Sequence, residues 1–115
     1  MSAYLELESR FRRIAALNEA VGMLHWDMSV VMPTGGASAR AEQLAALKLT
    51  IHEMKTSTEF HDLLEAAESD VLAGSWQRAN LREMRRSWVH ANAVDADLVE
   101  AMIRASSACE MVWRE

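Results

Sequence analysis

Apolar residues recur along this chain at alternating spacings of three and four, which is the period of one face of an α-helix. The first stripe predicts a long helix over about residues 4–31, roughly 40 Å in length. The helix must stop before Pro33, because a proline disfavours helical geometry in the residue that precedes it. The members of the stripe are Ile14, Leu17, Val21, Leu24, Met28 and Val31.

A glycine turn and two further helices are expected next. Gly35 and Gly36 lie in a predicted turn over residues 34–37, where both glycines permit a positive φ. The second helix is expected over residues 38–55, followed by a third that opens at residue 56 or 57 and continues to about residue 71. Thr56 and Glu59 have the spacing of a capping box at that opening. The apolar face of the second helix consists of Leu44, Leu47, Ile51 and Met54.

Two helices complete the chain. Gly74 breaks the third helix, and Ser75 is the expected cap of a fourth helix that ends at residue 92. The residues expected to point inward from the fourth helix are Leu81, Met84, Trp88 and Ala91. The fifth helix begins near Asp95 and runs through residue 113 without a stop signal, which predicts that it continues in a longer parent chain. Its apolar stripe consists of Leu98, Met102, Ala105, Cys109 and Val112.

The predicted fold class is therefore all-α, a bundle of about five helices in a single domain spanning residues 1–115. A chain of 115 residues is long enough to bury a modest core. The eight methionines and four tryptophans are expected mostly to fill that core, with Trp76, Trp88 and Trp113 on or near apolar stripes. Cys109 is the only cysteine, so an intramolecular disulfide is excluded, and we expect its side chain to be buried.

Charge and hydropathy exclude several classes of partner. The net charge is −5 and the pI is about 5.3, which argues against a nucleic acid held by its phosphates. Arg78, Arg82, Arg85 and Arg86 form the densest basic cluster, which we expect to be a solvated helix face. No apolar run approaches the ~18 residues of a membrane span. The sequence also shows no signal-peptide pattern, so a cytoplasmic location is expected.

Residues 52–56 begin like the HExxH motif, in which two histidines one helical turn apart bind zinc and the glutamate acts as general base. Here Thr56 occupies the second histidine position, and threonine does not replace imidazole at a zinc site. We therefore expect His52 to be a partly exposed histidine near a helix end. The other histidines, His25, His61 and His90, have no ligand partners at a suitable spacing. No catalytic residue and no metal ligand is assigned to this chain.

The most distinctive segment joins the first two predicted helices. It contains Trp26 and Asp27, then Met32, Pro33, Gly35 and Gly36, and finally Arg40, Glu42 and Gln43. One interpretation is structural: Asp27 accepts hydrogen bonds from the loop over residues 35–40 or from Arg40 itself, which pins the turn against the first helix. The other is that Trp26 and Asp27 line a substrate cleft. A buried Trp26 would also need an acceptor for its indole N–H.

This segment resembles the N-terminal signature of the carboxypeptidase Taq family, the zinc- or cobalt-dependent metallocarboxypeptidases of the HExxH class. The resemblance continues, in the same order, through residues 63–68, 76, 79–83, 85–86, 97–101 and 113–115. It implies that these residues correspond to the first fifth to quarter of a typical member. In such a member the N-terminal helices form a wall or lid over a deep cleft in an all-helical zincin fold.

The resemblance also implies what this chain lacks. In the family, a metal-activated water removes C-terminal amino acids from peptides, and the HExxH helix lies downstream of the section matched here. The chain is thus expected to be an N-terminal fragment without its own cofactor, catalytically inactive alone, with zinc or cobalt and the peptide substrate belonging to the full-length enzyme. The alternative is a stand-alone helical interaction module. In either case, exposed apolar helix faces predict a homo-oligomer, and family members are commonly homodimers.

Overall fold

The computed structural model describes residues 2–72 and 74–114, which form five α-helices, one short 3-10 turn and no strand. The predicted all-α class and the number of helices are confirmed. In order, the elements are α1 (Ala3–Val30), η1 (Thr34–Gly36), α2 (Ala37–Thr56), α3 (Thr58–Asp70), α4 (Trp76–Asn92) and α5 (Ala96–Trp113). None of the described helices is long and apolar enough to cross a membrane.

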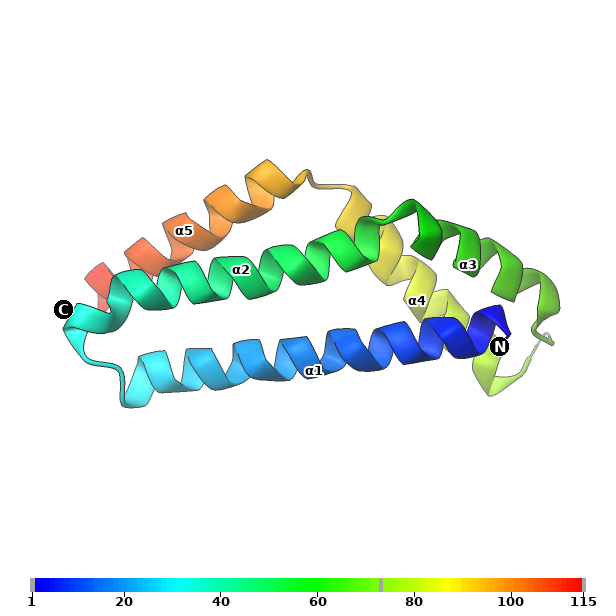
Figure 1. The fold of residues 1–115 in the computed structure, drawn as a ribbon, viewed down its shortest axis with the longest axis horizontal. Coiled ribbons are helices and arrows are strands. Elements are labelled where there is room, and N and C mark those ends of the chain that lie inside the picture. Colours follow the sequence, from blue (N-terminus) through cyan, green and yellow to red (C-terminus); the bar gives the residue numbers. More distant parts are fainter. Residues whose placement is uncertain (1, 73, 115) are drawn as a thin grey trace.

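The molecule is elongated, with extents of 53 × 25 × 22 Å, because two long antiparallel helices set its axis. Figure 1 shows α1 and α2 side by side along this axis, with α3 and α4 gathered at the end where α1 begins. Helix α5 returns along α2 toward the η1 turn. The end of α1, the beginning of α2 and the end of α5 therefore meet at one end of the molecule.

The core follows a seam along α1. Leu7, Ile14, Val21 and Met28 are buried and lie seven residues apart, which keeps them on one side of the helix. Phe60 and Leu64 of α3 are fully buried near the start of this seam, and the Phe60 ring lies 5.3 Å from that of Phe11. The remaining buried apolar residues are Leu44, Ala45, Ile51, Ala67, Leu81, Met84 and Ile103.

Of the two predicted openings of α3, residue 56 or 57, the structure has the second, and the predicted capping box of Thr56 and Glu59 is wrong. Ser57, not Thr56, is the N-cap, and its hydroxyl accepts a hydrogen bond from the Phe60 amide at 3.2 Å. Thr56 is instead the last residue of α2, and its hydroxyl donates to the His52 carbonyl at 2.9 Å. The Ser75 cap of α4 is confirmed, because its hydroxyl accepts from the Arg78 amide at 3.1 Å.

The predicted stripe of α5 does not face the core. The residues of α5 that pack inward are Ile103 and Ser107, with Val99 partly buried. Leu98, Met102, Ala105, Cys109 and Val112 lie on the exposed side. Apolar residues occupy two faces of this helix, so periodicity alone did not decide which of them packs against α2. Cys109, expected to be buried, is exposed for the same reason.

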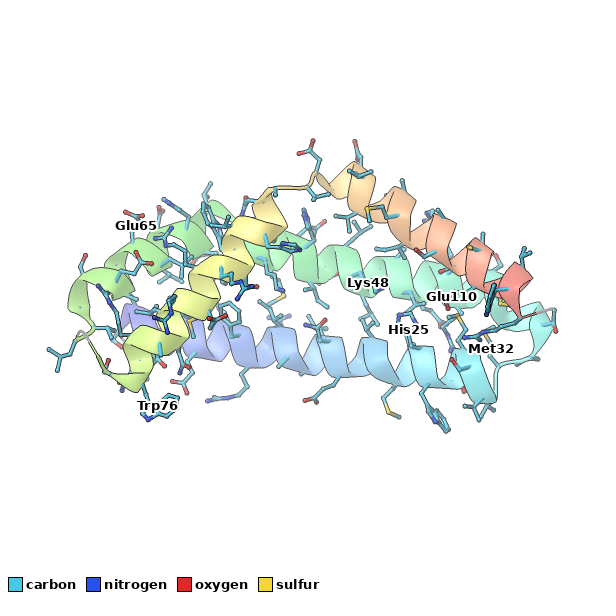
Figure 2. All side chains as sticks on the ribbon, turned by 180° about the vertical axis from the view of Figure 1, so that it is seen from behind. His25, Met32, Lys48, Glu65, Trp76 and Glu110 are labelled. Carbon is cyan, nitrogen blue, oxygen red and sulfur yellow. The ribbon has the colours of Figure 1, made fainter. Side chains whose placement is uncertain are left out.

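Most tryptophans also lie outside the core, contrary to prediction. Trp76 and Trp113 are 84% and 88% exposed, and Trp26 is exposed as well. Figure 2 shows Trp76 standing away from the ribbon at the start of α4. Only Trp88 of the four is partly buried against the core. The buried apolar interior consists of aliphatic residues, two methionines and one phenylalanine.

Candidate functional site

The segment singled out in the sequence lies at the end of the molecule where α1 meets α2. Its centre is Arg40, whose side chain is only 14% exposed. The guanidinium lies 2.8 Å from the Asp27 carboxylate and donates to the Leu24 carbonyl at 2.8 Å. Its Nε donates to Gln43 at 2.9 Å. The predicted contact between Asp27 and Arg40 is therefore present, and we call the residues Leu24, Asp27, Arg40 and Gln43 the clasp.

The turn beside the clasp is built by Met32, Pro33 and the two glycines. The amide of Met32 donates to the Asp27 carbonyl at 2.8 Å, and that of Gly36 to the Pro33 carbonyl at 2.9 Å. The two glycines permit a positive φ but do not adopt one: Gly36 has φ −86°, and only Gly74 among the described residues has a positive value. A Cβ at Gly36 would lie 3.1 Å from Cγ of Met32. A side chain at position 36 would therefore crowd Met32, whereas the backbone there does not require a positive φ.

Helix α5 is tied to the same end of the molecule by two arginines, Arg104 and Arg114, whose partners the sequence did not indicate. Arg104 donates to the carboxylates of Glu42 and Glu100, at 3.2 and 3.0 Å from its Nη2. By hydrogen bonding and by its charge, Arg104 lowers the pKa of Glu42 from its ordinary value. Arg114 donates to the Met28 carbonyl and to the Ser29 hydroxyl. The contacts of Arg104 with Glu42 and of Arg114 with α1 join residues more than 60 positions apart, so no local pattern indicated them.

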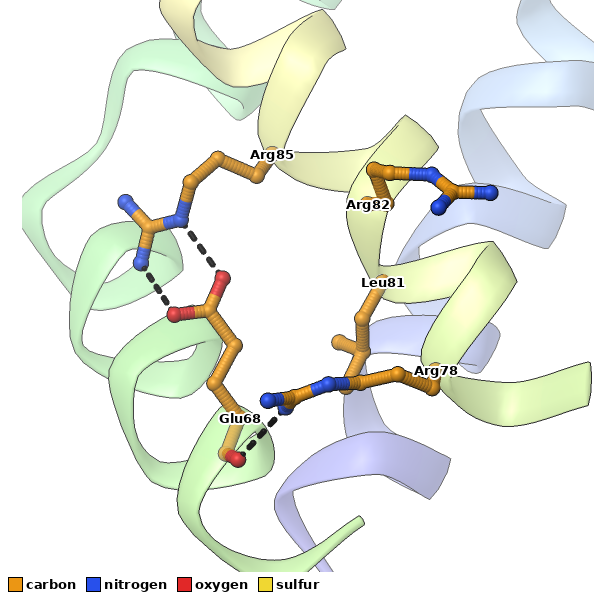
Figure 3. A pocket seen from close by; sticks show the side chains of 5 residues that line it. All are labelled: Glu68, Arg78, Leu81, Arg82 and Arg85. Atoms are coloured by element: carbon orange, nitrogen blue, oxygen red, sulfur yellow. Dashed lines mark hydrogen bonds and ion pairs between the residues drawn. The ribbon is translucent and has the colours of Figure 1, made fainter. Parts of the chain in front are cut away.

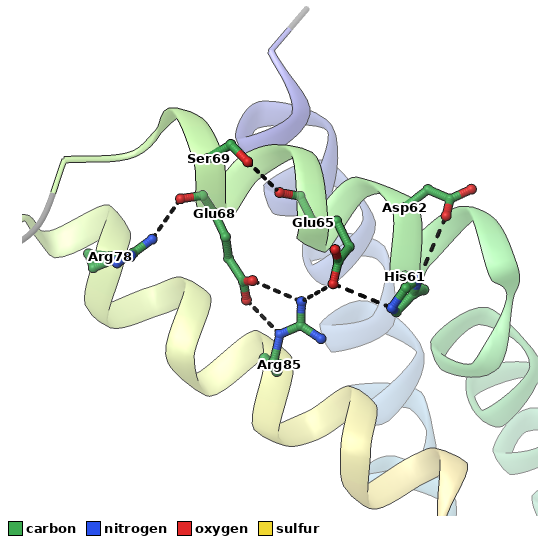
Figure 4. Close-up of polar contacts among 7 residues, drawn as sticks. All are labelled: His61, Asp62, Glu65, Glu68, Ser69, Arg78 and Arg85. Carbon is green, nitrogen blue, oxygen red and sulfur yellow. Dashed lines mark hydrogen bonds and ion pairs between the residues drawn. The ribbon is translucent and has the colours of Figure 1, made fainter.

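The predicted solvated basic face is wrong for Arg85. This arginine donates to Glu68 through two nitrogens, at 2.6 and 2.8 Å, and to Glu65 at 3.1 Å. Figure 4 shows this network across α3 and α4, with His61 on the other side of Glu65. The Arg85 guanidinium also lies 5.7 Å from the Trp88 ring centre. The network is a polar joint between two helices.

A pocket of about 330 Å³ lies beside this joint, lined by Glu68, Arg78, Leu81, Arg82 and Arg85. Figure 3 shows that two of its three arginines are engaged: Arg85 binds the Glu68 carboxylate and Arg78 donates to the Glu68 carbonyl at 2.8 Å. Arg82 points away from them. Glu68 therefore holds two of the three arginines as part of the contact between α3 and α4, and we regard the pocket as structural.

Replacing Glu68 with glutamine is expected to remove about 1 kcal/mol of stability at pH 7, a modest figure because the Glu68 side chain is 33% exposed and partly screened by water. The hydrogen bond from Arg85 lowers the pKa of Glu68 from 4.5. Its stabilisation is therefore complete above that value and is lost as the pH falls through the lower, folded value.

Chemical unfolding of the parent protein and of E68Q at pH 7 and at about pH 3 would check this. The difference in stability between them should shrink at the lower pH. A difference that is the same at both pH values would contradict the assignment of Glu68 as an ionised partner of Arg85.

His52 has a tertiary role that its sequence context did not reveal. Its Nε2 lies 3.0 Å from the Ala91 carbonyl and 2.8 Å from the Val94 carbonyl, where α4 turns toward α5. A carbonyl only accepts hydrogen bonds, so Nε2 carries the proton. The imidazole therefore closes the end of α4. Among the described residues, no group of three or more His, Cys, Asp or Glu side chains is placed to hold a metal ion.

Comparisons with known proteins show which family the chain belongs to. The family model for carboxypeptidase Taq (M32) metallopeptidases matches residues 6–115. The chain belongs to this family. It is 30% identical to thermostable carboxypeptidase 1 of Thermus thermophilus over 99% of its length, and 27% identical to the protein of the same name from Pyrococcus furiosus over 96%. Carboxypeptidase 1 of Bacillus subtilis is 27% identical over 90%. No solved structure gives a significant match.

The M32 chain spans less than a quarter of each of these relatives, 23%, 22% and 21% of their lengths. The clasp and the contacts that Arg104 and Arg114 make from α5 therefore belong to the section of the family's sequence that this chain covers. Of the residues singled out in the sequence, the structure brings Asp27, Arg40 and Gln43 into one hydrogen-bonded group. Glu42 faces α5 instead, and Trp26 points into solvent.

Proposed function

We propose that this M32 chain supplies the N-terminal helical section of a metallocarboxypeptidase that releases C-terminal amino acids from peptides. The family match over residues 6–115 supports the proposal. In this role the chain is structural. Helices α1 and α2, held together by the clasp, form a wall, and α5 is bound to the end of the wall at which the clasp lies. The cytoplasm is the compartment we propose for it.

The metal chemistry of the family does not fit the residues of this chain. The sequence has no HExxH motif, and the described residues offer no group of three donors to a cation. A catalytic zinc site needs three protein ligands and an open position for water. We therefore assign no hydrolytic step to these residues, and we propose that the chain by itself is inactive.

Metal analysis of the purified chain checks this proposal directly. We expect well below one equivalent of zinc or cobalt after dialysis, and no release of the C-terminal residue from a blocked dipeptide when either metal is added. One tightly held metal ion per chain, or metal-dependent hydrolysis, would overturn the proposal of inactivity.

The reading frame beyond residue 115 tests the role in a larger enzyme. A frame that continues into a helix with an HExxH motif supports the proposed role as a wall of the catalytic cleft. A stop codon directly after residue 115 would favour the second candidate, a separate helical interaction module.

One observation favours that second candidate. Two apolar stripes face solvent: Met23, Trp26 and Val30 on α1, and Leu98, Met102 and Val112 on α5. Contiguous exposed apolar surface of this kind marks an interaction site in a stable protein. As a module, the chain would self-associate through these two stripes.

Replacing Val30 and Val112 with lysine together is expected to weaken self-association at least about tenfold, since each lysine places a charge in an apolar contact. Sedimentation equilibrium of the chain and of V30K/V112K measures the effect. V89K is the control, because Val89 is also an exposed valine but lies on α4, outside both stripes. A parent chain that stays monomeric at high concentration would exclude self-association through these stripes.

A further inference from the structure

A second pocket, of about 330 Å³, lies between α2, α5 and the turn that follows α4. It is separate from the clasp and from the ion pairs of Arg85. Its volume falls within the range of about 300–1,000 Å³ that is usual for small-molecule sites. Most of its wall is apolar, formed by Val94, Val99, Met102 and Ile103. The exposed side chain of Met102 places the mouth of the pocket at the surface.

The polar part of the wall is cationic or neutral. Lys48, on the middle of α2 (Figure 2), lines the pocket and is half-buried. No described carboxylate pairs with its ammonium group, and no acidic residue lines the pocket. His52 and His90 complete the polar lining together with Ser106. The site thus presents one unpaired positive charge at the edge of an apolar hollow.

The wall of the pocket that carries Lys48 also carries His52. Lys48 and His52 are four residues apart on α2, so their side chains share one face. His52 is held in place by the carbonyls of Ala91 and Val94, which makes this wall a rigid one. An ammonium group donates three hydrogen bonds and accepts none, so the group that pairs with it must be an acceptor, and best an anion.

We propose that this pocket binds a small monocarboxylate with an apolar body of about five to eight carbons. The carboxylate pairs with Lys48, and the apolar body lies against Val99, Met102 and Ile103. A single ammonium group without an arginine fork suits one negative charge, whereas a polyphosphate would bring uncompensated charge into an apolar wall. Two sources share this chemistry: a free alkyl acid and an apolar amino-acid residue with its terminal carboxylate.

Titration of the full chain with octanoate and, separately, with N-acetyl-leucine tests the proposal and distinguishes the two sources. We expect saturable shifts in the NMR signals of the His52 and His90 rings, with a Kd on the order of 1 mM or below for at least one ligand. Octanol and octylamine, which lack the carboxylate, should bind at least about fivefold more weakly.

Lys48→Met keeps most of the apolar stem and removes the charge, so it is expected to raise the Kd at least about fivefold. Lys55→Met is the matched control, since Lys55 lies on the same helix but does not line the pocket. The proposal is overturned if neither carboxylate gives saturable shifts, if octanol or octylamine binds as tightly as octanoate, or if K48M and K55M behave alike. The comparison of octanoate with octanol uses the unaltered chain, so it tests the role of the carboxylate even if K48M fails to fold.

Discussion

Replacing Leu64 with alanine is expected to lower the free energy of unfolding by about 3 kcal/mol. Leu64 is fully buried on α3, where this helix packs against α1 and α4. Truncation removes its transfer free energy and leaves a cavity that the neighbouring helices cannot close without moving. Because a domain of this size is stable by only about 5–15 kcal/mol, the loss is a large part of the total. Urea unfolding followed by circular dichroism measures it.

Leu72→Ala is the matched control for that experiment. It is the same chemical change in the same part of the chain, but the Leu72 side chain is 80% exposed. Its expected effect is below about 0.5 kcal/mol. Equal losses for L64A and L72A would contradict the placement of α3 in the core.

Replacing Arg40 with methionine is expected to cost about 2 kcal/mol. The change removes the partner of Asp27 and the donor to the Leu24 carbonyl, and it leaves a partly buried carboxylate without its counter-charge. Thermal unfolding of R40M against the parent chain measures the loss. Lysine is expected to restore only part of it, because an ammonium group lacks the planar fork that serves three acceptors at once.

Arg12→Met is the control for the clasp. Arg12 lies on α1 with its side chain 77% exposed, and its ion pair with Glu8 is 3.7 Å long. It should therefore change stability by less than about 0.5 kcal/mol. In a double-mutant cycle, D27N should cost little once Arg40 is gone, because the two residues act through one contact. Fully additive losses would show that the Asp27–Arg40 contact contributes nothing in solution.

The helices themselves were largely predictable, for local reasons. Helix ends depend on neighbouring residues, so Pro33 and Ser75 marked them correctly. The clasp was also partly predictable, since Asp27 and Arg40 flank a single short turn. At the start of α3 two adjacent hydroxyl residues competed for the cap, and the geometry of the turn chose Ser57 over Thr56.

The faces of the helices and the long-range pairs were not predictable in the same way. Nothing near Glu42 in the sequence indicates Arg104, and nothing near His52 indicates the end of α4. Helix α5 shows the limit clearly, because it carries apolar residues on more than one side. The side with Ile103 became the core only because it is the one that packs against α2.

The sequence by itself determined that this chain is helical, where most of its helices begin and end, and which family its motifs resemble. These properties follow from interactions between residues a few positions apart, which a linear pattern records. Only the tertiary structure decided which stripe of α5 and which tryptophans meet solvent, which arginines are paired, and that Lys48 faces a pocket without a carboxylate. Those outcomes depend on how whole helices pack, since burial and charge pairing are settled between surfaces that are distant in the chain.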